Sequence, residues 1–151
     1  MMPACAALTL PPIVPPRRAD WPERLHAFVE SRRHDPFAWG RNDCATFAAG
    51  AVCAMTGAHL GALLPGGWGN QSDAARLLAD LCGLEAAAVR MLGEPLRGMP
   101  ARYAPRGSVV LVPIEQRPTL GLMLGRDVWC APGQSGLVFR PAAEVRVAWV
   151  I

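Results

Sequence analysis

The hydrophobic pattern of this 151-residue chain changes its period at Arg106. Before that point apolar residues recur at helical spacing, and after it they gather in short β-rich runs separated by Gly and Pro. The runs are Val109–Val112, Leu120–Leu124, Val128–Cys130, Leu137–Arg140 and Val145–Ile151. Helices followed by an antiparallel meander predict an α+β domain, with N-terminal helices packed on one face of a small C-terminal antiparallel sheet or half-barrel.

Capping residues and glycines divide the first part into four expected helices. These cover about 20–33, then the stretch from a cap at Asn42 or Asp43 to Gly57, then 74–82 after a start at Ser72 or Asp73, and finally 84–92. The length suits a single domain over 20–151. Residues 1–19 form a proline-rich arm whose five prolines, up to Pro16, oppose a helix.

Charge and hydropathy exclude several classes of protein. The formal net charge is +3, all 15 basic residues are Arg, and no basic residues alternate with aromatic ones, so we expect no nucleic-acid binding. No apolar run reaches the roughly 18 residues that cross a bilayer, so we expect no membrane span. The first 16 residues lack the basic start of a secretion signal, which favours a product of the bacterial cytoplasm.

The five cysteines, at positions 5, 44, 53, 82 and 130, contain no Cys-x-x-Cys pair. This spacing indicates neither a disulfide framework nor a zinc ribbon, and we expect no cofactor. Cys44 differs from the others because it falls in the first turn of the second expected helix. Unpaired N–H groups and the helix dipole at that place favour a thiolate and can hold an oxyanion, as a nucleophile requires.

Cys44 lies within a longer motif, Phe37-Ala38-Trp39-Gly40-Arg41-Asn42-Asp43-Cys44-Ala45-Thr46-Phe47. It is followed by Arg106–Val112 and by Leu120–Gly125. Together these segments resemble the NlpC-type cysteine peptidases of the papain-like superfamily, over about residues 20–151. The form of the Trp-Gly and Asp-Cys block is most similar to small proteins of tailed-phage tail-tip gene clusters. The resemblance implies a papain-like fold, a Cys nucleophile, a strand His as base and a second His or polar group that orients it.

Placed on this sequence, the family pattern puts Cys44, preceded by Asp43, on the nucleophile. The base position is Thr119 and the orienting position is Cys130, so both expected histidines are absent. The family's usual tyrosine is Phe37, and the aspartate of its Gly-Asp strand start is Ser108. These departures all affect positions that take part in catalysis in the family.

The three histidines offer few substitutes for that base. His59 lies 15 residues beyond Cys44, roughly 20 Å away along the helix. His26 belongs to the polar side of the first helix. His34, in a loop before the motif, is the one histidine whose distance the sequence leaves open, and only His34 could restore a triad.

We therefore expect a structural component of a phage tail tip or baseplate, built on a catalytically inactive NlpC-like fold and located in the virion. Its partners would be other tail-tip or baseplate hub proteins. The arm would dock on them through apolar residues and through two arginines that pair with carboxylates, while Trp21 anchors the arm to its own domain. The docking residues are Leu8, Leu10, Ile13, Val14, Arg17 and Arg18.

Two alternatives stay open at the level of sequence. The first is an active peptidoglycan cysteine peptidase or amidase, with Cys44 as nucleophile and a base from His34 or a partner. The second is a metal-binding tail assembly factor that uses Cys44, Cys130 and other residues. The four tryptophans after Trp21 are read as core or interface anchors rather than a sugar-stacking platform.

Overall fold

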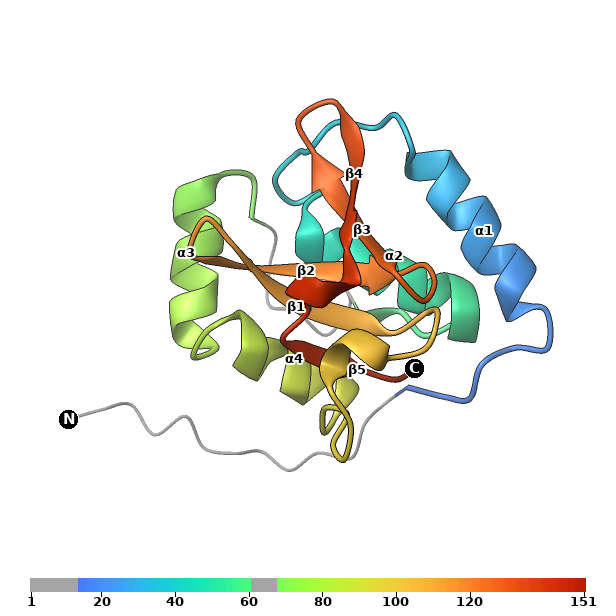
Figure 1. Cartoon of the computed structure of the whole chain (residues 1–151). Coiled ribbons are helices and arrows are strands. Elements are labelled where there is room, and N and C mark those ends of the chain that lie inside the picture. Colours follow the sequence, from blue (N-terminus) through green and yellow to red (C-terminus); the bar gives the residue numbers. More distant parts are fainter. Residues whose placement is uncertain (1–13, 61–67) are drawn as a thin grey trace.

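The computed structural model describes residues 14–60 and 68–151 and confirms the α+β class (Figure 1). Four α-helices come first, at the places that the caps and glycines predicted. They are α1 (Trp21–Arg32), α2 (Cys44–Thr56), α3 (Gln71–Asp80) and α4 (Leu84–Leu92). Five strands follow, namely β1 (Val109–Ile114), β2 (Arg117–Met123), β3 (Val128–Gly133), β4 (Gly136–Pro141) and β5 (Val147–Trp149). The short 3₁₀ helices η2 (Ala101–Tyr103) and η3 (Ala142–Glu144) flank the strands.

The strands form one antiparallel sheet in the order β4-β3-β2-β1-β5. The first four strands make the predicted meander, and β5 returns to pair with β1. β1 is buried at four successive positions, so apolar residues occupy both faces of the central part of the sheet. The sheet therefore has two covered faces rather than one.

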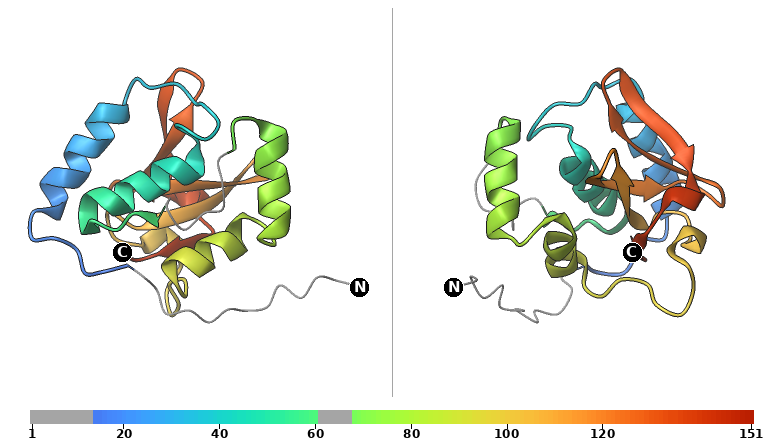
Figure 2. Two further views of the ribbon diagram at one scale, coloured as in Figure 1. Left: turned by 180° about the vertical axis from the view of Figure 1, so that it is seen from behind. Right: turned by 60° about the vertical axis from the view of Figure 1, so that its left-hand side comes forward.

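The four α-helices lie on the same side of the sheet (Figure 2, left). Leu120 and Leu122 of β2 face them, and Leu122 packs against Phe47 and Met55 of α2. The alternate residues, such as Met123 and Trp129, face the segment around η2 and η3 on the other side. This arrangement confirms the prediction of helices on one face, with α2 as the helix that lies directly on β2 and β3.

One helix boundary differs from the prediction. The third helix begins at Gln71 and ends at Asp80, so its expected start at Ser72 or Asp73 and its extent over 74–82 are wrong. Asn70 is the cap, and its side-chain oxygen accepts a hydrogen bond from the Asp73 N–H at 2.8 Å. Asn, Ser and Asp are all good caps, so residue type alone could not select among the neighbouring candidates.

Candidate functional site

The start of α2 is fixed by Asp43, whose side chain is buried. One carboxylate oxygen accepts the Thr46 N–H at 2.8 Å, and the Thr46 hydroxyl accepts the Asp43 N–H at 2.9 Å, which makes a capping box. The other oxygen accepts the Gly40 N–H at 2.8 Å and the indole N–H of Trp68. Asp43 thus holds the helix start, the preceding turn and Trp68 together.

Gly40 explains the Trp-Gly pair of the motif. Its φ is +73°, and a Cβ added there would lie against the backbone carbonyl oxygen of Trp68. Glycine is required because the backbone conformation is left-handed and no side chain fits. The neighbouring Asn42 donates from its amide to the carbonyls of Asp35 and Pro36, at 3.1 and 3.0 Å. The motif therefore builds the loop that presents Cys44.

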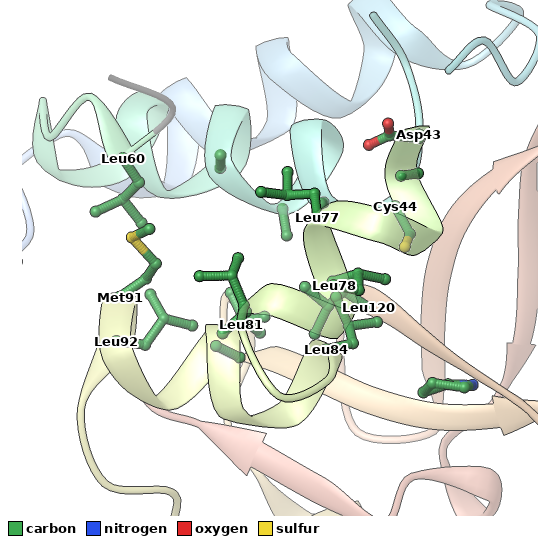
Figure 3. A pocket seen from close by; sticks show the side chains of 18 of the residues that line it. Asp43, Cys44, Leu60, Leu77, Leu78, Leu81, Leu84, Met91, Leu92 and Leu120 are labelled. Carbon is green, nitrogen blue, oxygen red and sulfur yellow. The ribbon is translucent and has the colours of Figure 1, made fainter. Parts of the chain in front are cut away.

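Cys44 lies on the wall of an apolar cavity of about 170 Å³ bounded by α2, α3, α4 and the β1–β2 part of the sheet (Figure 3). Asp43 and Cys44 lie at one end of it, and Leu60, Met91 and Leu92 lie at the other. The leucines of α3 and of the start of α4 line the wall between these ends. The prediction that Cys44 opens the second helix and faces the sheet is confirmed for β2, because Leu120 shares this cavity.

The thiol of Cys44 is not activated in this environment. Burial, with a smaller contribution from the nearby Asp43 carboxylate, raises its pKa from the ordinary 9.0 to about 11. The backbone N–H groups of Leu120 and Ala45 oppose these effects without cancelling them. The N–H groups at the helix start favour the thiolate, as expected, but loss of hydration outweighs their effect. At neutral pH the thiol keeps its proton.

Thr119, the expected base position, lies on β2 opposite Val112. Its hydroxyl donates to the carbonyl of Arg117 at 3.5 Å. The β2 residues that line the cavity are Pro118 and Leu120, on either side of Thr119. The structure thus brings the strand to Cys44, but the described residues of β2 at that place offer neither an imidazole nor a carboxylate.

Cys130, the expected orienting position, is fully buried on β3. It packs with Leu122 and Phe47 in a core cluster that contains Leu25 of α1 and does not include Cys44. Burial raises the pKa of Cys130 to about 12 despite the opposing effect of Arg33. Cys130 is a packed core thiol, and the structure does not bring it to the cavity.

The three histidines are exposed, and none is among the described residues that line the cavity. His34 lies in the turn after α1, where its backbone approaches Gly136 of the β3–β4 hairpin. His59 lies beyond the C-terminal end of α2, with its Nδ1 atom 3.6 Å from the sulfur of Cys53. The Cys53–His59 contact had no signal in the sequence, because it depends on how the chain turns after Gly57.

The comparison with known families gives one match. Residues 16–151 fit the model of a family described as a domain of unknown function, DUF6950. The chain belongs to this family. No curated protein and no solved structure shows a significant match to it.

The match of the DUF6950 domain begins at Pro16, within the segment expected to be a free arm. Of the docking residues, Leu8, Leu10 and Ile13 lie outside the described part of the structure, and Val14 packs against the core cluster beside the cavity. The end of the arm thus contributes to the fold of its own chain.

The two arginines of the arm differ in their surroundings. The guanidinium of Arg17 lies 4.0 Å from the ring of Trp21 and donates to the carbonyl of Arg106 at 3.1 Å. Loss of hydration lowers the pKa of Arg17. Trp21 therefore anchors the arm as predicted, but Arg17 is engaged within its own domain instead of lying free for a partner. Arg18 has an exposed side chain, and its N–H donates to the carbonyl of Met55 at 2.8 Å.

The cysteines and acidic residues of the DUF6950 domain form no group of three or more that could hold a metal ion within residues 14–60 and 68–151. Cys44, Cys53 and Cys130 carry free thiols, whereas Cys82 is disulfide-bonded. The expectation that the scattered cysteines form no disulfide is wrong for Cys82. In the same ranges no helix is both long enough and apolar enough to cross a bilayer.

Sequence reasoning missed the cavity itself. Its wall comes from residues that the sequence places on the apolar faces of three separate helices, and each is an ordinary core position for such a helix. A signal was nevertheless present in the small side chains of α2, where Ala45, Ala48 and Ala49 face four leucines of α3 and α4. Small residues opposite leucines leave an empty space only if the helices are held apart. The distance between helices cannot be read from a sequence.

Proposed function

We propose that the chain is a non-catalytic domain of NlpC-like, papain-like type that serves as a structural component of a phage tail tip or baseplate. The observation that carries the proposal is that the described wall around the buried thiol of Cys44 contains no histidine, while burial raises the pKa of that thiol to about 11. A cysteine peptidase needs a base within hydrogen-bond reach to remove the thiol proton and to return it to the leaving amine.

The finer fold assignment is supported by the place of Cys44. It opens α2, which packs against β2 and β3 of an antiparallel sheet, and the Asp43 cap with Gly40 sets the loop before it. These features agree with the layout that the motif predicts for a papain-like domain. The base and orienting positions of that layout are occupied by Thr119 and Cys130. Neither residue lines the cavity with Cys44.

The rival function, an active peptidoglycan peptidase, would need a base from elsewhere. His34 is exposed and lies beside the β3–β4 hairpin. A partner would have to insert an imidazole next to Cys44 and remove the effect of Asp43 on the thiol. The proposed scaffold role needs neither step.

The arm provides the test of the assembly role. We expect deletion of residues 6–13, which removes Leu8, Leu10 and Ile13, to leave the domain folded, because the contacts of Val14 and Arg17 with the domain are kept. The same deletion should prevent incorporation into phage particles, which is measured by probing purified particles with an antibody against the chain. Circular dichroism of the purified variant checks the fold.

The matched control is Cys44→Ala, which should enter particles and leave infectivity nearly unchanged. The reverse pattern, in which the arm is dispensable and Cys44 is essential, would show that the chain is an enzyme and not a scaffold.

A further inference from the structure

We propose that the cavity between α2, α3, α4 and the sheet binds a short unbranched alkyl chain of about six to eight carbons. This inference does not depend on the assembly role, because it needs only the cavity. The ligand class is a single-chain amphiphile, for which 1-alkanols serve as the probe.

The wall of the cavity excludes a polar ligand from its interior. Beyond the Cys44 end, the described wall residues are aliphatic or are methionine, with Leu78, Leu84 and Met91 among them. The carboxylate of Asp43 is already satisfied by the Thr46 and Gly40 N–H groups and by Trp68. A polar group placed deep in this space would lose its hydration without gaining a hydrogen bond.

The shape of the cavity favours a chain over a ring system. Its wall follows α2 from Cys44 to Val52, which is eight residue steps, or about 12 Å at the rise of a helix. A fully extended chain advances about 1.2 Å per bond, so about 12 Å would take about ten bonds, or about eleven carbons. The volume sets the tighter limit, since a dry cavity of about 150 Å³ is known to hold a six-carbon ring. The volume here, about 170 Å³, therefore admits six to eight carbons.

Among the described residues of its wall, Trp39 and Pro118 at the Cys44 end are exposed, whereas Leu60 at the other end is buried. We therefore place the opening of the cavity at the Cys44 end. An amphiphile would place its methyl end against Leu60 and Met91 and keep its head in water beside Trp39. The neutral thiol of Cys44 and the ring of Trp68 would contact the first carbons of the chain.

The experiment measures binding of 1-alkanols from butanol to dodecanol to the full-length chain by isothermal titration calorimetry. Affinity should rise about fourfold for each added CH₂, the gain expected for burial of one methylene. The rise should stop at seven or eight carbons, where the cavity is full. Absence of binding, or affinity that keeps rising to dodecanol as on an open apolar surface, would overturn the proposal.

Two variants separate the cavity from other apolar surface. Ala49→Leu fills the wall beside α2 and should lower the affinity for octanol at least tenfold, whereas Ala54→Leu, at a half-buried position of the same helix outside the cavity, should not. Met91→Ala enlarges the closed end and should move the plateau to chains two or three carbons longer. Equal affinity in the two leucine variants, or an unmoved plateau in Met91→Ala, would contradict the assignment.

Discussion

At the scale of single residues, Cys44 shows how two local effects compete. Its place at the start of α2 favours a thiolate, but the apolar wall around it and the carboxylate of Asp43 favour the thiol. A dipole effect at a helix end contributes about 1 kcal/mol, whereas the rise of the Cys44 pKa from 9.0 to about 11 corresponds to roughly 3 kcal/mol. The sequence predicts the first effect and cannot predict the second, because burial depends on residues of α3, α4 and β2.

The reactivity of Cys44 should therefore begin only at high pH. In a Cys53→Ser variant, which removes the other half-buried free thiol, alkylation of Cys44 by iodoacetamide should keep accelerating up to pH 10, with a midpoint near 11. The reason is that only the thiolate reacts and its fraction grows tenfold per pH unit below the pKa. Peptide mass spectrometry at several pH values gives the rate, and a plateau already reached at pH 8 would refute the raised pKa.

Asp43 should matter more for stability than an ordinary helix cap. Asp43→Ala removes the capping box and leaves the N–H groups of Gly40 and Trp68 without their acceptor, so we expect a loss of about 3 kcal/mol in the free energy of unfolding. Asn70→Ala removes the exposed cap of α3 and should cost about 1 kcal/mol. Urea denaturation of both variants measures the difference, and equal losses would argue against the linking role of Asp43.

At the scale of elements, the sequence predicts the helices and strands well and their assembly only in part. Caps, glycines and the change of period locate α1, α2, α4 and the meander. The start of α3 depends on a choice among adjacent polar residues, and the cavity depends on how far apart the helices lie. Thr119 shows the same limit. Its neighbours Pro118 and Leu120 line the cavity with Cys44, and the motif alone does not predict which residues of β2 do so.

The β1–β2 turn is a case in which residue types conflict with the backbone. Ile114 pairs with Arg117, and the two residues between them, Glu115 and Gln116, both have positive φ, at 50° and 65°. A two-residue turn of this kind favours Asn-Gly. Replacing Glu115 with Asn and Gln116 with Gly should stabilise the domain by about 1 kcal/mol and raise the Tm by about 2–4 °C.

Differential scanning calorimetry of the doubly substituted chain measures that change. As a control, Gln134→Asn with Ser135→Gly alters the β3–β4 turn, whose two central residues do not have positive φ. The control should give no comparable gain. A lower Tm for the β1–β2 variant would show that the two native side chains stabilise the turn in a way that the backbone angles do not reveal.

At the scale of the whole molecule, the proposed role depends on an ordered Cys44 loop that has no described base beside it. The loop, cap and glycine that present Cys44 are intact, while the thiol is neutral and the described cavity wall carries no histidine. The end of the arm belongs to the domain through Val14 and Arg17, and its earlier apolar residues remain for a partner in the proposed role. In the proposed role the chain acts by its place in an assembly and not by hydrolysis.

The most direct test is incubation of the purified full-length chain with peptidoglycan, followed by separation of the released muropeptides by liquid chromatography and mass spectrometry. We predict that the wild type and Cys44→Ala give the same profile as peptidoglycan without protein. New muropeptides that appear with the wild type and disappear with Cys44→Ala would contradict the account.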